Sequence, residues 1–224
     1  MIPIKDNIPS KKIPFINYLL IFINIVVFAL EIKAGNMLEL LIKRYAFYSN
    51  EFYYLLTGQL FSLDPIKKIF TSMFMHGGFS HILGNMLYLY IFGDNVEDRL
   101  GHFKYLLLYL FFGICAALLQ FLFNPLSDIP MIGASGAVSG VMGAYFIFFP
   151  KARVITILPV FIFIHFVEIP AVFFLVFWFV LQFLYGSLSV ATGVINVAWW
   201  AHVGGFVAGF LIALFFKMFL RNRR

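Results

Sequence analysis

Apolar runs of near-membrane length constrain this chain more than any other feature. Six such runs occur, at residues 13–30, 82–92, 105–123, 132–149, 167–184 and 203–216. A helix needs about 20 apolar residues to cross the hydrocarbon core of a bilayer, and several runs approach that length. Extended to their polar flanks, they predict spans at residues 13–32, 80–98, 103–123, 133–149, 167–186 and 200–219. We expect an all-α membrane protein, a bundle of six transmembrane helices forming one domain over residues 1–224.

The composition excludes several other classes of protein. Hydrophobic residues make up 62% of the chain and charged residues 12%, which is too little polar surface to cover a soluble domain. A single cysteine, Cys115, rules out an intramolecular disulfide and argues against a cysteine-rich metal site. The net charge of +6 sits mostly at the ends of the apolar runs. It therefore indicates membrane topology, and no nucleic-acid partner is expected.

The basic residues also predict an orientation. With six spans and a cytoplasmic N-terminus, eleven of the 16 lysines and arginines fall in inside segments, among them Arg223 and Arg224. The other five fall in outside segments, as the positive-inside rule requires. Four of these five lie in the first loop, residues 34–79, where the segment 44–61 mixes aromatic and polar side chains. Such a segment suits the headgroup boundary, so we expect an interfacial first loop, with a substrate-orienting role as the alternative.

Polar groups inside the even-numbered spans point to function, because polar side chains are costly in lipid. His81 and Asn85 share one face of the second span, Ser135 opens the fourth, and His202 lies near the start of the sixth. These three spans run in the same direction. Counting back from their inner boundaries at 1.5 Å per residue places the three groups roughly 20–22 Å from the inner face. They should therefore lie in one layer below the outer surface.

Small residues explain how the fourth and sixth spans could meet. Gly136-x-x-x-Gly140 and Gly205-x-x-x-Gly209 are small-x-x-x-small patterns, which let helix backbones approach closely. We assign these four glycines, together with Gly133, to helix packing.

If those helix faces meet, Ser135 and His202 come within hydrogen-bond reach. A neutral histidine can take the serine proton and return it to a leaving amine. The start of a helix offers free backbone N–H groups to a developing anion, and His81 and Asn85 could add side-chain donors. No carboxylate lies in the outer half of these spans, so a Ser–His dyad without acidic support is expected.

Three motifs, His81-x-x-x-Asn85, Gly133-x-Ser135-Gly136 and Ala201-His202-x-x-Gly205-x-x-x-Gly209, occur in this order on alternate spans. Together they resemble the rhomboid family of intramembrane serine proteases, over about residues 67–216. Residues 70–76 (FTSMFMH) and 96–101 (VEDRLG) extend the resemblance.

The resemblance implies a compact six-helix bundle that hydrolyses peptide bonds in or near the transmembrane segments of single-span membrane proteins, with no cofactor. It assigns Ser135 as nucleophile, His202 as general base and acid, and His81, Asn85 and the Ser135 backbone N–H as the oxyanion site. Span five, with Trp178, would be the gate for substrates arriving sideways from the bilayer. The expected location is a prokaryotic cell membrane, with both termini cytoplasmic and the site open to the outer side.

Two positions depart from the family pattern. Members often carry Trp-Arg in the first loop, where this chain has Lys67-Lys68. Some members place a tyrosine four residues after the nucleophile, stacked under the histidine, where this chain has Ser139. One element of histidine orientation is therefore missing.

Other interpretations of the same residues remain open. Ser135 could be a helix N-cap and His202 a packed polar contact. His76 and His81 could suggest a metal pair, but their spacing is poor on a helix and no HExxH motif exists, so we expect no metal. The chain could also be a non-catalytic rhomboid-like scaffold that binds membrane segments. A transporter or channel would need a polar path or an inverted repeat, and neither is evident.

Overall fold

A computed structural model describes residues 1–160, 163–192 and 197–221 of the chain. Arg223 and Arg224, which were counted among the inside charges, lie outside the described residues. In chain order the helices and strands are β1 (Ile2–Asp6), α1 (Phe15–Ala34), η1 (Gly35–Met37), α2 (Leu38–Tyr45), α3 (Ser49–Leu56), α4 (Asp64–Thr71), η2 (Ser72–Phe74), α5 (Phe79–Leu100), α6 (His102–Phe123), α7 (Ser135–Phe148), β2 (Arg153–Val160), β3 (Phe163–Pro170), α8 (Ala171–Thr192) and α9 (Trp199–Arg221).

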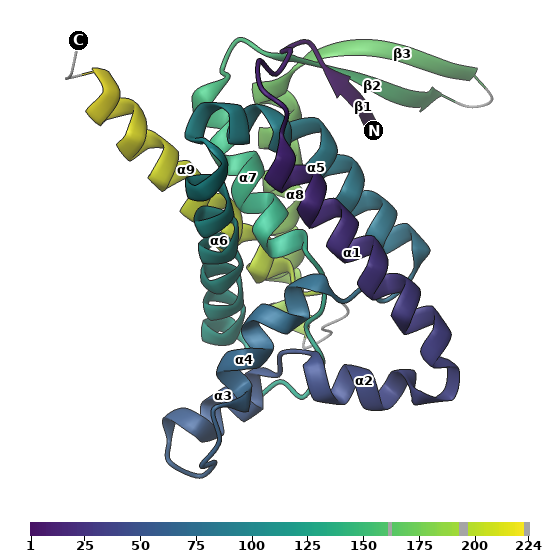
Figure 1. The fold of residues 1–224 in the computed structure, drawn as a ribbon, viewed down its shortest axis with the longest axis vertical. Coiled ribbons are helices and arrows are strands. Elements are labelled where there is room, and N and C mark those ends of the chain that lie inside the picture. The colour runs from purple at the N-terminus through teal and green to yellow at the C-terminus, as the bar shows by residue number, and fades with distance from the viewer. Residues whose placement is uncertain (161–162, 193–196, 222–224) are drawn as a thin grey trace.

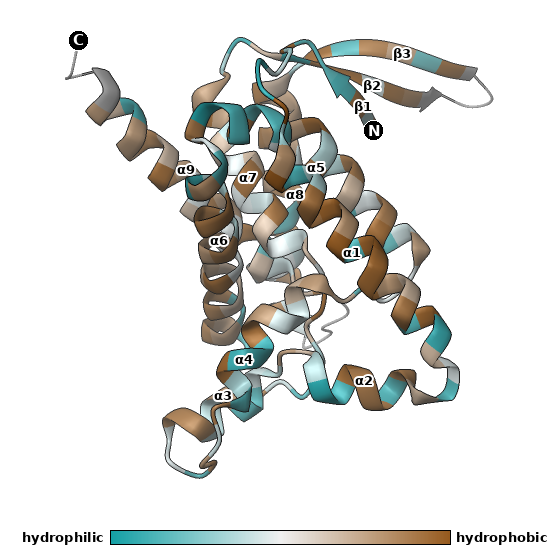
Figure 2. Cartoon of the chain, in the orientation of Figure 1, coloured by the Kyte–Doolittle hydropathy of each residue, from teal (hydrophilic) through white to brown (hydrophobic). Residues whose placement is uncertain are grey.

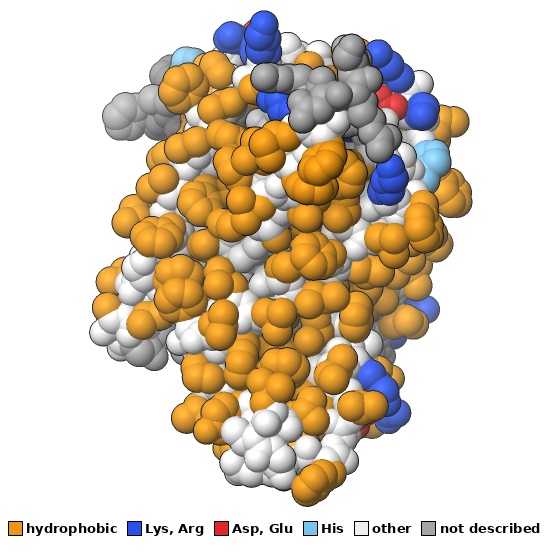
Figure 3. Space-filling model, turned by 90° about the vertical axis from the view of Figure 1, so that its left-hand side faces the viewer, with side chains coloured by type: hydrophobic (Ala, Val, Ile, Leu, Met, Phe, Trp, Pro, Cys, Tyr) orange, Lys and Arg blue, Asp and Glu red, His pale blue; other side chains and the backbone are white. Residues whose placement is uncertain are grey.

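A helical bundle dominates the structure, and each predicted span corresponds to one of its helices, α1, α5, α6, α7, α8 or α9. Four helical segments in the described chain are long and apolar enough to cross a membrane: Phe15–Tyr45, His102–Phe123, Ala171–Thr192 and Trp199–Phe219. The helix α5 carries charged residues near its C-terminal end, and α7 has only 14 residues. Hydrophobic residues cover most of the bundle's length (Figure 2), and the face shown in Figure 3 is largely apolar.

A small β-sheet corrects the all-α prediction. The strands pair antiparallel in the order β1-β2-β3, at the end of the molecule where both chain termini lie (Figure 1). The fifth span was predicted to begin at residue 167, but β3 occupies the chain up to Pro170. β-Branched residues crowd β2, RVITILPV, and they favour a pleated strand. A short apolar run of this kind cannot be told from the start of a helix by hydrophobicity alone.

The helix α7 is the centre of the bundle, between α6 and α9. Its residues Gly136–Tyr145 are all buried. A Cβ at Gly205 or Gly209 of α9 would overlap the carbonyl oxygens of Gly136 or Gly140 on α7, so α9 depends on glycine for this close approach. The missing Cβ atoms of Gly136 and Gly140 face α6 instead, against Ala116 and Phe112. The two small-residue patterns therefore let α7 pack tightly on both neighbours.

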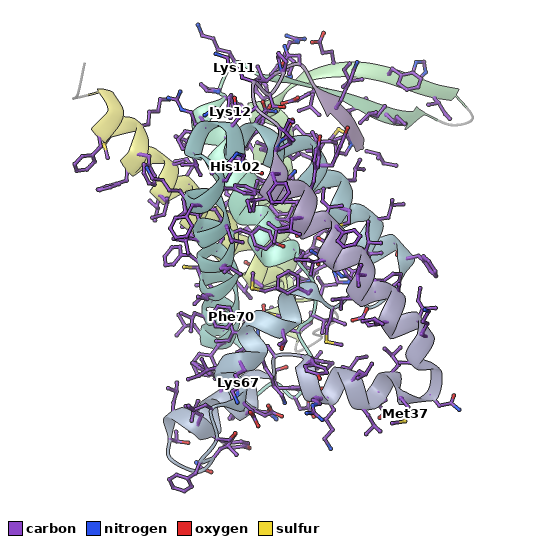
Figure 4. All side chains as sticks on the ribbon, in the orientation of Figure 1. Lys11, Lys12, Met37, Lys67, Phe70 and His102 are labelled. Atoms are coloured by element: carbon purple, nitrogen blue, oxygen red, sulfur yellow. The ribbon has the colours of Figure 1, made fainter. Side chains whose placement is uncertain are left out.

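The first loop is mostly helical and is tied to the segment before α7. Phe47 and Met131 exchange backbone hydrogen bonds of 3.2 and 2.8 Å. Lys68 Nζ lies 2.7 Å from Glu51 Oε2, an ion pair that joins α4 to α3. Lys67 points outward from α4, at the end of the molecule opposite Lys11 and Lys12 (Figure 4).

A second polar cluster, which we call the α1–α5 cluster, consists of Asn17, Glu97 and Tyr105. The Glu97 carboxylate accepts the backbone N–H groups of Ile16 and Asn17, at 3.0 and 2.7 Å, where α1 begins. The Asn17 amide donates to the Leu89 carbonyl at 3.0 Å and accepts the Tyr105 hydroxyl at 2.7 Å. Every member is buried and bonded, and the cluster fixes α1 against α5 and α6.

Candidate active site

The side chains of Ser135 and His202 meet although 67 residues separate them. Ser135 Oγ lies 2.8 Å from His202 Nε2. The close approach of α7 and α9 through Gly205 and Gly209 sets this distance, because both residues lie in the first turns of their helices. The geometry is that of a nucleophile and its general base.

The position of Ser135 in α7 differs from that of an N-cap. Ala134 holds the cap position, and its side chain makes no capping hydrogen bond. Ser135 is the first helical residue, and its hydroxyl bonds to His202 instead. The first backbone N–H groups of a helix have no carbonyl partner within it. The Ser135 amide is therefore available to an anion formed near its own Oγ.

His81 and Gly133 face Ser135 from the other side of the site. A Cβ at Gly133 would lie 2.7 Å from His81 Nε2 and 3.5 Å from Ser135 Oγ, so both atoms border the same space. His81 Nδ1 accepts the Gly77 N–H at 3.4 Å, which leaves the ring proton on Nε2, facing that space. Gly133 precedes α7, and its φ of +125° is one that side-chain-bearing residues rarely adopt. Gly133 was assigned to helix packing from the sequence; in the structure its missing Cβ opens space between His81 and Ser135.

Asn85 lies one turn after His81 on α5. It is buried, yet its Nδ2 has no hydrogen-bond partner among the described residues. A buried amide without a partner is uncommon and calls for an explanation. Asn85, His81, Ser135 and His202 all line one cavity of about 600 Å³. The free donor is therefore available to a group that occupies the cavity.

Gln182 on α8 completes the site, and the sequence analysis did not identify it. Its Oε1 lies 2.7 Å from His202 Nδ1, the ring nitrogen opposite the one at Ser135. The signal in the sequence was one polar residue in the apolar run FWFVLQFLYG of span five. That run carries no spacing motif that would link it to His202.

Trp178, Ser139 and His76 lie near this centre, and Glu168 lies away from it in the β-sheet. Trp178, one turn before Gln182, is half-buried, with its ring centroid 6.0 Å from that of His202. Ser139 is buried and donates to the Gly136 carbonyl at 2.8 Å, so it takes no part in orienting the histidine. The ring of His76 packs edge-on against the ring of His81, with their centroids 5.2 Å apart. The spacing of the two histidines was judged as if both lay on one helix, but His76 precedes α5. Glu168 pairs with Arg153 on the neighbouring strand, at 3.1 Å.

A comparison with known protein families decides the family. The family model described as Rhomboid domain matches residues 64–219. The chain belongs to the rhomboid family. This match covers all the site residues described above, from His76 to His202. The rhomboid domain and the four apolar helices together make the chain an integral membrane protein.

Curated rhomboid relatives are similar over part of their length. RHOMBOID-like protein 1 of Arabidopsis thaliana is 30% identical over 152 residues, which is 67% of this chain and 34% of that protein. RHOMBOID-like protein 4 of the same plant is 34% identical over 155 residues, 66% of this chain and 34% of that protein. Rhomboid protease GluP of Bacillus subtilis (strain 168) is 34% identical over 133 residues, 58% of this chain and 24% of GluP. The chain thus spans about a third or less of each of these relatives.

The departure from the rhomboid pattern at Lys67-Lys68 has a structural explanation. Lys68 is buried, bonded to Glu51, and lies 5.1 Å from the centroid of the Tyr48 ring. A basic side chain at this position therefore holds α4 to α3 inside the first loop. Lys67 is exposed and pairs only with the nearby Asp64, at 3.3 Å.

Proposed function

We propose that this rhomboid chain is a serine endopeptidase that cleaves membrane-spanning substrate proteins by a Ser–His mechanism. The observation that carries the proposal is the 2.8 Å contact between Ser135 Oγ and His202 Nε2, at the wall of a cavity that is also lined by Asn85, whose Nδ2 has no partner among the described residues. The similarity to Rhomboid protease GluP supports the same activity.

In the first half of the reaction, Ser135 Oγ attacks the scissile carbonyl carbon while His202 Nε2 takes its proton. The carbonyl oxygen becomes an oxyanion, and His81 Nε2–H, Asn85 Nδ2 and the Ser135 N–H are the donors around it. One such donor is typically worth about 3–4 kcal/mol of barrier. The intermediate collapses as the C–N bond breaks, and His202 gives its proton to the leaving amine. An acyl ester on Ser135 remains.

In the second half, a water molecule in the cavity attacks the acyl ester. His202 takes a proton from that water, and the same three donors stabilise the second oxyanion. Collapse returns the proton to Ser135 Oγ and releases the carboxylate product. None of these steps uses a cofactor.

The membrane arrangement belongs to the same proposal. We place six spans, α1, α5, α6, α7, α8 and α9, with both termini in the cytoplasm, the first loop at the outer interface, and the site open to the outer side of a prokaryotic cell membrane. The strand β1 and the C-terminal end of α9 lie at the same end of the molecule, as an even number of crossings requires (Figure 1). Exposed apolar side chains near the tip of the first loop, including Phe61 at 95% exposure, suit contact with lipid.

Substrates would reach the cavity from the side, past α8 and Trp178. Only a minority of the residues of α8 are buried, and those in its middle face the cavity and α9. The expected substrates are therefore single spans that can lie against this helix and unwind near Ser135.

The test uses purified protein in detergent or liposomes with a panel of single-span membrane proteins. Wild type should release two fragments whose new termini, mapped by mass spectrometry, fall in or near the span. Ser135→Ala should release none. Equal cleavage by the two proteins would refute the proposal. Persistent binding of spans without cleavage, unaffected by His202→Ala, would indicate a scaffold instead.

A further inference from the structure

Gln182 is a polar residue in the middle of an otherwise apolar helix. Its side chain is only 7% exposed, and it lies among phenylalanine, leucine and valine residues of α8. A buried amide without partners would destabilise the fold, so its hydrogen bonds show what the residue does.

Both ends of the Gln182 amide are bonded, which fixes its orientation. The Nε2 group donates to the Trp178 carbonyl one turn earlier, at 3.3 Å. The Oε1 atom therefore faces His202 Nδ1, at 2.7 Å. An amide oxygen only accepts hydrogen bonds, so His202 Nδ1 must carry the ring proton. The lone pair is then on Nε2, directed at the Ser135 hydroxyl.

We infer that Gln182 is a positioning residue for His202, holding the imidazole in the tautomer that can accept the Ser135 proton. This inference deepens the proposed function and rests on it. Among the described residues that line the cavity there is no carboxylate, and a neutral amide oxygen can also select the Nδ1–H tautomer. It also supplies the orientation that a tyrosine at position 139 would give in other rhomboids.

The helix α8 holds His202 at two consecutive turns. Trp178 lies against the ring, with centroids 6.0 Å apart, and Gln182 bonds its Nδ1 edge. One turn further on, the Gly186 carbonyl accepts the indole N–H of Trp200 from α9, at 3.2 Å. These contacts fix α8 in register with α9. While α8 stays packed against α9, these contacts keep Gln182 Oε1 at His202 Nδ1.

Kinetics of two variants test this role. Gln182→Leu keeps the size of the side chain and removes the acceptor. It should lower kcat on the order of 10- to 100-fold and change KM by less than about twofold. This loss is smaller than the ~10⁴-fold loss caused by an Asp→Asn change in a Ser-His-Asp triad, because that change both imposes the wrong tautomer and removes a charge. Gln182→Glu restores an acceptor and should recover most of kcat. Ser187→Ala should match wild type, because Ser187 lies on the same helix and its hydroxyl, within the part of the chain that the structure describes, donates to the Phe183 carbonyl alone.

A purely structural role for Gln182 predicts a different result. It would lower the thermal midpoint and leave kcat per folded molecule unchanged in Gln182→Leu. Wild-type kcat in this variant, in a protein whose cleavage still requires Ser135, would overturn the inference and leave the proposed function standing.

Nitrogen-15 NMR of the histidine rings gives a readout that does not depend on proteolysis. The chain has five histidines, and the His202 signals can be assigned by their loss in His202→Ala. The wild type should show His202 protonated at Nδ1, and Gln182→Leu should lose this single tautomer. Protonation at Nε2 in the wild type would overturn the inference even if the protein is an active protease. If Ser135→Ala cleaves like wild type, the proposed function fails while this measurement still tests the bond.

Discussion

The two polar clusters of the bundle differ in how completely their groups are bonded. In the α1–α5 cluster, Glu97, Asn17 and Tyr105 bond to one another and to backbone groups, and little space remains between them. Around Ser135, the side chains of His81, Asn85 and His202 border a cavity of about 600 Å³, and Asn85 Nδ2 has no partner among the described residues. Polar side chains in a membrane bundle thus stabilise the fold where they are satisfied. Where they are left free around a cavity, they are available to a substrate.

From this comparison, we expect substitutions around Ser135 to affect mainly activity and substitutions in the α1–α5 cluster to affect mainly stability. Truncation of the His202 or Asn85 side chain should reduce turnover and leave the thermal midpoint nearly unchanged. Changes in the α1–α5 cluster should do the reverse. A site variant that unfolds the protein, or a cluster variant that stops catalysis in folded protein, would break the comparison.

The largest effect is expected from His202→Ala. Without the base, Ser135 keeps its proton. We expect kcat to fall by roughly 10⁴-fold or more, as it does when one residue of a Ser-His-Asp triad is removed. Fragment release from a single-span substrate measures it. The double variant with Ser135→Ala should lose no more activity than either single variant, because the two residues act as a unit. Additive losses would contradict that.

Asn85→Ala should have the second-largest effect on turnover. The loss of one oxyanion donor should reduce kcat on the order of 10²- to 10³-fold. KM should change little, since this donor acts on the oxyanion. The control is Leu83→Ala on the same helix, whose side chain is 70% exposed on the outside of the bundle. Equal rates for the two variants would remove Asn85 from the oxyanion site.

Gly133→Ala should reduce kcat by about 10²-fold, the scale of a small misplacement of reacting groups. The added methyl group would occupy the space between His81 Nε2 and Ser135 Oγ, and the positive φ would add strain. Gly58→Ala is a control for the positive φ, because Gly58 has a φ of +72°, a Cβ there meets no atom within 4 Å, and Gly58 is not among the described residues that line the cavity. Full activity in Gly133→Ala would show that this space is not used in catalysis.

The smallest effects on turnover are expected in the α1–α5 cluster. Tyr105→Phe removes the hydroxyl bonded to Asn17 and should lower the free energy of unfolding by about 1 kcal/mol. Glu97→Gln weakens the acceptor for two backbone N–H groups and should cost about 1–3 kcal/mol. Thermal unfolding in detergent checks both, and kcat per folded molecule should stay within about twofold of wild type.

Spacing and order in the sequence predicted much of the fold and the site. Apolar runs located the helices to within a few residues, except for the fifth run, where β3 takes up the start and α8 continues to Thr192, past the predicted end at residue 186. Helical periodicity put His81 and Asn85 on one face, and the glycine patterns anticipated the contact of α7 with α9. These features are local or repeated at fixed spacing, so they can be recognised from the sequence alone.

Contacts between distant elements could not be read in this way. Gln182 reaches His202 only because α8 crosses α9 at one particular register, which no motif records. The role of Gly133 depends on where the ring of His81 lies in space. The pairing of β1 with β2 joins the N-terminal residues to a strand about 150 positions later. These contacts are determined by how the helices and strands pack together. The residue pattern of one segment does not indicate which other segment it will contact.

Covalent labelling of Ser135 tests the central claim most directly. A fluorophosphonate, which reacts with activated serine hydroxyls, should modify wild type at Ser135 alone among its serines, as mapped by peptide mass spectrometry. The labelling rate should fall at least 100-fold in His202→Ala while the thermal midpoint is retained. Labelling of Ser135 at the same rate in both proteins, or no labelling of folded wild type, would contradict activation of Ser135 by His202.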